Sequence, residues 1–153
     1  MTKRMLIALV ALVGLFVASY LALFKLGVIG ELACSTGGCE TVQLSRWATF
    51  FGLPVALWGV GFYAAALAVS MIGLGERFAD ARAIPAALVV MSGWGVLFSA
   101  WLTYLELFVI HAICRYCVVS AALVLVIFVL SVMDLREVRE PATGADYDEA
   151  AAE

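Results

Sequence analysis

The sequence reads HAICRYCVVSAALVLV from residue 111 to residue 126, and two cysteines stand there at the start of a long apolar run. Cys114 and Cys117 form a Cys-x-x-Cys motif, and the apolar run extends over Tyr116–Met133. A helix that crosses the hydrocarbon of a bilayer needs about 20 predominantly apolar residues, with a range of about 17–25. The stretch therefore predicts a membrane-spanning helix that begins with two close thiols.

Three earlier runs have the same character, and these are Met5–Ile29, Leu53–Leu74 and Pro85–Ile110. Hydrophobic residues make up 65% of the 153 residues, against about 45–50% in ordinary soluble domains. The first run exceeds the apolar core of a cleavable signal peptide, which is about 7–15 residues long. We therefore predict an all-α membrane protein, with one domain over residues 1–133 that forms a four-transmembrane-helix bundle.

The basic residues predict how this bundle is oriented, because Lys and Arg accumulate in cytoplasmic segments. With a cytoplasmic N-terminus, the inner segments contain Lys3, Arg4, Arg77, Arg82, Arg136 and Arg139. Only Arg46 and Arg115 then lie in outer loops, and Lys25 lies near the outer end of the first helix. We predict a multi-pass protein of the cell (inner) membrane with both termini cytoplasmic.

The C-terminal segment, residues 134–153, differs from the rest in composition. It carries seven of the twelve acidic residues and few apolar ones. Such a segment cannot bury enough apolar surface to fold by itself. It is predicted to be an acidic, disordered cytoplasmic tail.

All four cysteines fall on the outer, periplasmic side of the predicted membrane, where disulfides can persist. Cys34 and Cys39 of the loop CSTGGC form one pair, and Cys114 and Cys117 form the other. Two structural disulfides, a zinc site and redox exchange are the three interpretations considered. Redox exchange is preferred, because a Cys-x-x-Cys at a helix N-terminus lies in the positive end of the helix dipole, which favours the reactive thiolate.

Redox exchange needs a final electron acceptor. The chain has one histidine, His111, which excludes a bis-histidine haem, and its Gly-x-Gly fragments lie in or beside membrane helices rather than after strands. We predict no haem, flavin or metal and no nucleic-acid partner. A quinone dissolved in the bilayer, ubiquinone or menaquinone, is the acceptor that fits, and the bundle core beside Cys117 is a reasonable place for its flat ring.

Three segments resemble the bacterial members of the vitamin K epoxide reductase family. These are CSTGGCETV, then SRWATFFGLPVALWGVGFY leading into the second helix, and CRYC opening the fourth. With these segments in this order, the resemblance extends over about residues 1–133. The resemblance implies a four-helix membrane enzyme that oxidises a thioredoxin-like protein of the DsbA type and reduces a quinone, which supports disulfide bond formation. The chain ends too soon for a fused thioredoxin-like domain, so a separate partner is expected.

The resemblance also implies a role for each cysteine. Cys117 would face the quinone, Cys114 would exchange with Cys39, and Cys34 would meet the thiol of the partner. Ser45 matches a serine that recurs in the loop of the family, and it is therefore a candidate for contact with the quinone.

Two positions depart from the vertebrate enzymes of this family. Those enzymes carry a polar amide near the position of Val55 and a tyrosine near the position of Ala121. Both differences favour plain quinone reduction over epoxide reduction.

Two alternatives remain. The disulfide-bond-formation protein B family also has four helices, a quinone and two cysteine pairs, but there the Cys-x-x-Cys precedes the wider pair, whereas here the order is reversed. A different class is a structural or assembly subunit whose outer loops are stapled by disulfides. Quinone reduction by a dithiol would separate that subunit from both enzymes.

The segment VQLSRWATFFG, residues 42–52, is predicted to be a short interfacial helix in the first outer loop. It could anchor the protein to the membrane surface, cover the quinone pocket, or do both. Phe51 of this segment and Trp58 of the second helix are further candidates to contact the quinone.

Two more polar residues lie near the outer ends of the predicted helices. Glu106 is assigned mainly a structural role, pairing with Lys25 or with a loop N–H, while a proton carrier is the alternative, because quinone reduction consumes two protons. His111 is expected to cap the third helix rather than to stabilise a thiolate.

Overall fold

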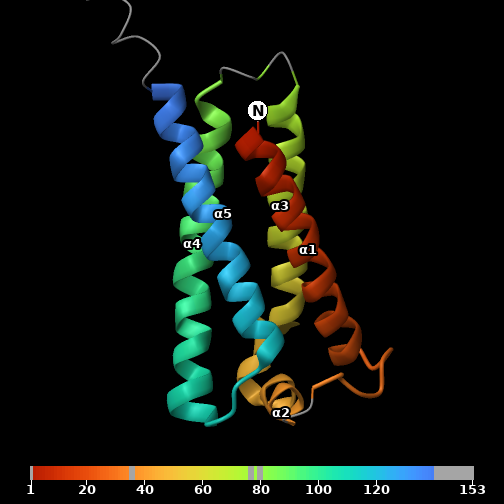
Figure 1. Cartoon of the computed structure of the whole chain (residues 1–153). Coiled ribbons are helices and arrows are strands. Elements are labelled where there is room, and N and C mark those ends of the chain that lie inside the picture. Colours follow the sequence, from red (N-terminus) through yellow and green to blue (C-terminus); the bar gives the residue numbers. More distant parts are fainter. Residues whose placement is uncertain (1, 35–36, 76–77, 79–80, 140–153) are drawn as a thin grey trace, which may run out of the picture.

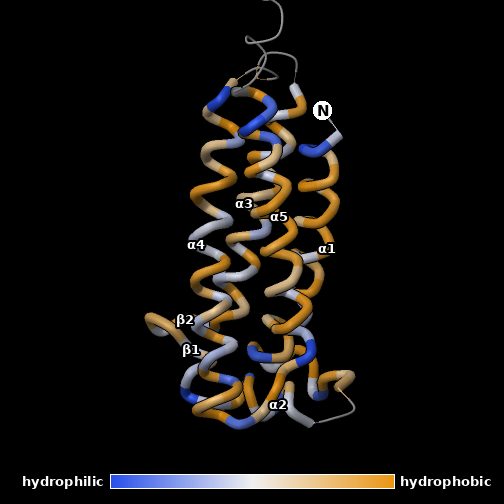
Figure 2. The backbone as a smooth tube through the Cα atoms, turned by 60° about the vertical axis from the view of Figure 1, so that its left-hand side comes forward, coloured by the Kyte–Doolittle hydropathy of each residue, from blue (hydrophilic) through white to orange (hydrophobic). Residues whose placement is uncertain are grey.

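The structure is a computed structural model that describes residues 2–34, 37–75, 78 and 81–139. Four long helices form the bundle in Figure 1: α1 (Thr2–Lys25), α3 (Val55–Leu74), α4 (Ala83–Leu105) and α5 (Arg115–Arg139). Each is long and apolar enough to cross a membrane. Figure 2 shows hydrophobic residues along their whole length, with the most hydrophilic residues near the two ends. The predicted four-helix membrane bundle is confirmed.

The two ends of the bundle are different. The N-terminus and the end of α5 lie at one end, and α2 lies at the other together with the start of α5 (Figure 1). We call these the terminal end and the cysteine end. The chain therefore places the start of α1 and the end of α5 on the side opposite to its cysteines.

Small residues let α1 pack closely on its neighbours α3 and α5. The buried face of α1 includes Ile7, Ala11, Gly14 and Ala18, at alternating spacings of four and three residues. A Cβ atom on Gly14 would lie only 2.1 Å from the ring of Tyr63 on α3. Close approach at small residues is the usual way in which membrane helices gain packing energy without a hydrophobic driving force.

The first loop differs from its prediction. Instead of one helix over residues 42–52, it contains helix α2 (Gly38–Leu44), a 3₁₀ turn η1 (Arg46–Ala48) and a hairpin of β1 (Thr49–Phe50) and β2 (Leu53–Pro54). The hairpin turn has positive φ at both central residues, 52° at Phe51 and 78° at Gly52. Such a two-residue turn matches the twist of a hairpin and cannot belong to a right-handed helix. A short helix is present, but it begins and ends earlier than predicted.

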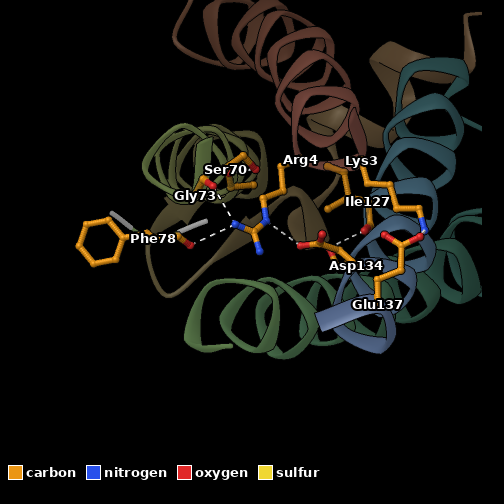
Figure 3. A network of polar contacts seen from close by, with 10 residues as sticks. Lys3, Arg4, Ser70, Gly73, Phe78, Ile127, Asp134 and Glu137 are labelled. Carbon is orange, nitrogen blue, oxygen red and sulfur yellow. Dashed lines mark hydrogen bonds and ion pairs between the residues drawn. The ribbon is translucent and has the colours of Figure 1, made fainter. Parts of the chain in front are cut away.

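A buried polar network closes the terminal end. Figure 3 shows the Arg4 guanidinium between α5 and the chain that follows α3. Its Nε donates to Asp134 Oδ2 at 2.8 Å, and its Nη1 donates to the carbonyl oxygens of Gly73 at 2.7 Å and Phe78 at 3.2 Å. Arg4 and Asp134 are both almost fully buried, with exposed fractions of 3% and 4%.

This network corrects the start of the predicted tail. Helix α5 continues to Arg139, so the prediction of disorder from Asp134 is wrong for the first six residues. Asp134 looks like a tail residue in the sequence, but its ion pair with Arg4 makes it part of the bundle. The remainder of the predicted tail, residues 140–153, lies outside the described residues.

We expect Arg4→Met to lower the free energy of unfolding by about 3–5 kcal/mol, because it leaves the Asp134 carboxylate buried without its partner. Lys3→Ala is the matched control, since Lys3 pairs with Glu137, whose side chain is 63% exposed, and such surface pairs contribute about 0–1 kcal/mol. Unfolding of the purified protein in detergent measures both. Equal effects of the two substitutions would contradict the assigned importance of the Arg4–Asp134 pair.

Candidate active site

The four cysteines lie together at the cysteine end. Cys34 and Cys39 form a disulfide with a Cα–Cα distance of 6.2 Å, whereas Cys114 and Cys117 are free thiols. Cys39 and Cys114 are fully buried in one apolar cluster, and Cys34 and Cys117 are partly buried at its edge. The fold thus brings together two pairs that are 75 residues apart in the sequence.

The backbones that carry the two pairs approach very closely. Gly38, the first residue of α2, would place a Cβ atom 2.4 Å from the carbonyl oxygen of Ile113. Gly38 precedes Cys39 and Ile113 precedes Cys114. Because the atom that blocks a side chain is backbone, only glycine fits at position 38 without a shift of one segment.

Two tyrosines hold the loop beside Cys34. The hydroxyl of Tyr20 on α1 accepts the N–H of Ala33 at 3.0 Å, and the hydroxyl of Tyr116 on α5 donates to the Ala33 carbonyl oxygen at 2.9 Å. The two rings are in edge-to-face contact, with centroids 5.3 Å apart. Since Tyr116 lies between Cys114 and Cys117, one of these anchors comes from the Cys-x-x-Cys motif itself.

Cys114 occupies the position just before α5. Its carbonyl oxygen accepts the N–H of Val118 at 3.0 Å, which is the first bond of the helix. A hydrogen bond with the Cys117 thiol, helped by the backbone N–H groups of Cys117 and Tyr116, lowers the pKa of Cys114, although burial and the nearby Glu106 oppose the shift. A lowered pKa increases the thiolate fraction, which is the nucleophilic form.

Glu106 fixes the connection between α4 and α5. After Leu105 the helix widens into a π-helical turn, η3 (Glu106–Ile110), which ends where His111 adopts the left-handed conformation and donates its N–H to the Glu106 carbonyl oxygen. The Glu106 carboxyl accepts the N–H of Cys114 at 3.1 Å. The expected pairing of Glu106 with a loop N–H and the capping by His111 are therefore confirmed.

Lys25 forms its hydrogen bond with helix α2 rather than with Glu106. It is the last residue of α1, and its Nζ donates to the backbone carbonyl oxygen of Gln43 at 2.6 Å. Lys25 therefore joins α1 to α2, and the expected alternative of a Lys25–Glu106 pair is wrong.

A large apolar cavity opens inside the bundle next to Cys117. Its volume is about 700 Å³, which lies within the range of about 300–1,000 Å³ typical of small-molecule sites. Helices α3, α4 and α5 and the hairpin supply most of its wall. The lining includes seven aromatic side chains, and they are Phe50, Phe51, Trp58, Phe62, Tyr63, Trp94 and Phe98. The polar groups at the cysteine end of this wall are Gln43, Glu106 and Cys117.

The predicted contact residues occupy different places around this cavity. Phe51 and Trp58 line it, and the Trp58 Nε1–H donates to the Phe50 carbonyl oxygen at 3.2 Å, which holds the hairpin to α3. Val55 and Ala121, the two departures from the vertebrate enzymes, line it as well. The hairpin reaches α4 through an edge-to-face contact of Phe50 with Phe98.

Ser45 lies beside this cavity rather than in its wall. Its hydroxyl donates to the Val42 carbonyl oxygen at 2.7 Å, where α2 ends. It lines a neighbouring small cavity of about 30 Å³, which Glu106 and Cys117 also border. Contact of Ser45 with a quinone stays a prediction.

Sequence reasoning missed Gln43. This side chain is 6% exposed, and its Nε2 lies 3.8 Å from the Cys117 sulfur, to which it donates. The signal was available: Gln43 lies four residues after Cys39, which puts both on one face of a helix. It was hidden because the predicted helix began at residue 42.

The structure also bears on the zinc interpretation. The sulfurs of Cys34 and Cys39 are bonded to each other and cannot act together as thiolate ligands in this state. Within the part of the chain that the structure describes, no three His, Cys, Asp or Glu side chains are arranged to hold a metal ion.

The model of the vitamin K epoxide reductase family matches residues 5–132. This range contains α3 and α4 completely, most of α1 and α5, both cysteine pairs and the whole wall of the cavity.

We expect Gly38→Ala to slow disulfide formation between Cys39 and Cys114 about tenfold, because a methyl forced into a packed contact costs about 1–3 kcal/mol. The measurement is cross-link formation in a protein that also carries Cys34→Ser and Cys117→Ser, followed by mass spectrometry. Gly30→Ala is the control, since a Cβ atom there meets nothing within 4 Å. Equal rates for the two alanine variants would show that the close approach at Gly38 does not set the distance between the pairs.

Proposed function

Because the chain belongs to the vitamin K epoxide reductase family, we propose that it oxidises a thioredoxin-like partner and passes the electrons through both cysteine pairs to a membrane quinone. The family places it among membrane thiol-disulfide oxidoreductases, which work with a thioredoxin-like partner and a quinone. The partner is proposed to be a thiol oxidase of the DsbA type, and the net result is disulfide bond formation.

One observation carries the proposal. Cys114 lies in the buried cluster that contains Cys39, while Cys117, three residues later, lines the 700 Å³ cavity. A Cys-x-x-Cys motif placed in this way has one thiol beside the first pair and the other beside a site for an apolar ring. These positions support a relay from the loop pair through Cys114 and Cys117 to the quinone.

Each step of the proposed relay is a thiol-disulfide exchange. The partner reduces the Cys34–Cys39 disulfide by attack on Cys34. The Cys39 thiolate then attacks Cys114 in an oxidised Cys114–Cys117 pair and releases the Cys117 thiolate. Attack of Cys34 on Cys39 expels Cys114 and leaves the loop disulfide with two inner thiols. The lowered pKa of Cys114 helps this last step, because a thiol of lower pKa leaves faster.

The bonding state of the structure corresponds to the end of that sequence. A disulfide joins Cys34 to Cys39, and Cys114 and Cys117 are thiols. The remaining step is reduction of the quinone by the inner pair. The two free thiols also argue against a subunit in which both pairs serve as structural staples.

The cavity suits a quinone by size and by chemistry. Aromatic rings such as Trp58 and Phe98 offer flat apolar faces, and the Cys117 thiol lies at one end of the wall. Val55 and Ala121 provide no polar group at the two positions where the vertebrate enzymes have them. We therefore propose ubiquinone or menaquinone, rather than an epoxide, as the substrate of this cavity.

Orientation completes the proposal. The terminal end carries Lys3, Arg4 and Arg82, and the positive-inside rule places it in the cytoplasm of an inner-membrane protein. The cysteine end would then face the periplasm, where the partner operates and disulfides persist.

The relay order predicts which intermediate each substitution traps, because removing the resolving thiol preserves the mixed disulfide. Cys34→Ser should accumulate a Cys39–Cys114 disulfide, because Cys34 is the thiol that displaces Cys114, and Cys39→Ser should accumulate a mixed disulfide between Cys34 and the partner. Mass spectrometry of non-reducing digests identifies both. A Cys34–Cys114 bond in Cys39→Ser would reverse the order of the loop thiols.

Quinone reduction by a small dithiol tests the inner pair separately. A small dithiol reaches Cys114 and Cys117 without the loop, so activity should survive replacement of Cys34 and Cys39 by serine. It should be lost when either inner cysteine is replaced. Full activity of Cys117→Ser would remove the Cys-x-x-Cys motif from the proposed active site.

The orientation is tested by labelling intact cells with a membrane-impermeant thiol reagent. In a protein whose four cysteines are replaced by serine, a cysteine at the exposed position Glu31 should be labelled, and one at the exposed position Ala83 should not. The reverse pattern would place the cysteine end in the reducing cytoplasm and contradict the proposed role in periplasmic disulfide formation.

A further inference from the structure

We propose that Glu106 is the proton-transfer residue of quinone reduction and carries protons from the inner thiols to the quinone. The inference rests on the proposed function, since it concerns the step in which the cavity substrate is reduced. It adds a catalytic residue to a site whose cysteines account only for the electrons.

The position of Glu106 is the first argument. Its side chain is only 4% exposed, at the cysteine end of α4, and it borders both the large and the small cavity together with Cys117. Its carboxyl also interacts with the Cys117 thiol. The same carboxyl group thus lies beside a reacting sulfur and faces the space proposed for the quinone.

The hydrogen-bond capacity of Glu106 is the second argument. Oε2 accepts the N–H of Cys114 at 3.1 Å, which fixes the carboxyl in place. A carboxyl group has two oxygens and about four acceptor sites. The structural bond to Cys114 therefore leaves capacity for a proton from Cys117, and anchoring and proton transfer are compatible roles.

Among the groups described beside the two thiols, Glu106 is the one that can accept and donate protons. The titratable groups that interact with it are Cys114 and Cys117. The other elements around it present uncharged side chains to the cavity, Gln43 from α2 and Val55 from α3. In the described part of the chain no ion pair joins Glu106 to a cation, and the nearby Lys25 donates to the Gln43 carbonyl oxygen instead.

The reaction balances with Glu106 as a carrier. Two S–H bonds break at Cys114 and Cys117, one S–S bond forms, and the two electrons released reduce the quinone. Glu106 accepts each thiol proton in turn and delivers it to a quinone oxygen, which produces the hydroquinone. The carboxyl group returns to its starting state, and no further oxidant or reductant is needed.

The decisive substitution is Glu106→Gln. The amide oxygen of glutamine still accepts the Cys114 N–H, so the fold of η3 is kept, but the amide cannot carry a proton. With dithiothreitol and a short-chain ubiquinone analogue, we expect the rate to fall about 100-fold or more, since general acid-base catalysis contributes about 10²–10⁴-fold. Glu106→Asp, which keeps the carboxyl, should retain more activity than Glu106→Gln.

Glu40→Gln is the matched control. The Glu40 carboxyl also lies at the cysteine end and accepts a backbone N–H, that of Leu32 at 3.4 Å, but it does not line the cavity. Its substitution should leave the rate unchanged. A Glu106→Gln rate within about twofold of wild type would overturn the inference while leaving the proposed function intact, whereas full activity of Cys117→Ser would overturn the proposed function itself.

A second measurement needs neither turnover nor quinone. The infrared difference spectrum between the reduced and oxidised inner pair of the wild-type protein should contain a carboxyl C=O band, because oxidation removes the thiol proton that contacts Glu106. This band should persist in Glu40→Gln and vanish in Glu106→Gln. A wild-type spectrum without a redox-linked carboxyl band would overturn the inference even if Glu106→Gln failed to fold.

Discussion

The hydrogen bond from the Cys114 N–H to the Glu106 carboxyl is the contact on which the geometry of the site depends. It joins the first residue of η3 to the residue before α5 and so fixes the direction in which α5 begins. With that direction set, Cys114 lies in the buried cluster with Cys39, and Cys117 lies in the wall of the cavity. The π-helical turn and the left-handed His111 follow from the same need, because the chain must reverse within a few residues while its buried polar groups keep their partners.

The two ends of the bundle differ in how their buried polar groups are paired. At the terminal end, Arg4 and Asp134 neutralise each other, and the Arg4 guanidinium also donates to two backbone carbonyl oxygens. Within the helices, buried serines such as Ser70 and Ser131 donate to the carbonyl oxygen four residues earlier. At the cysteine end, Glu106 binds one N–H and otherwise faces thiols and a cavity. A membrane protein tolerates an incompletely paired ionisable group mainly where it serves a function, and this contrast between the ends supports a chemical role for Glu106.

Much of the architecture could be predicted because the hydrocarbon imposes it. Runs such as Leu53–Leu74 have to be helical, and α3 agrees with that run within two residues. The position of both cysteine pairs at the same end of the bundle also followed from topology. The first pair comes after one membrane-spanning helix and the second after three, so both lie on the same side. What could not be predicted depends on tertiary contacts: the hairpin turn at Phe51, whose positive φ is uncommon for a large side chain, and the helical state of Asp134, which requires Arg4. Gln43 was missed because the predicted helix began at residue 42 instead of residue 38, which hid the four-residue spacing between Cys39 and Gln43.

The different surroundings of Cys114 and Cys117 result from helix geometry. A residue that precedes a helix projects from its end, whereas a residue three positions later lies on its side, so two neighbouring thiols face two compartments of the fold. The first compartment is the packed cluster reached through Cys39, and the second is the cavity that opens toward the lipid-embedded helices. In the proposed relay this separation keeps the bulky partner away from the quinone. The electrons pass between them by thiol-disulfide exchange between the two cysteine pairs inside the protein. The close packing of Gly38 against Ile113 is then a requirement of function as well as of folding, since the two pairs can exchange only if their backbones nearly touch.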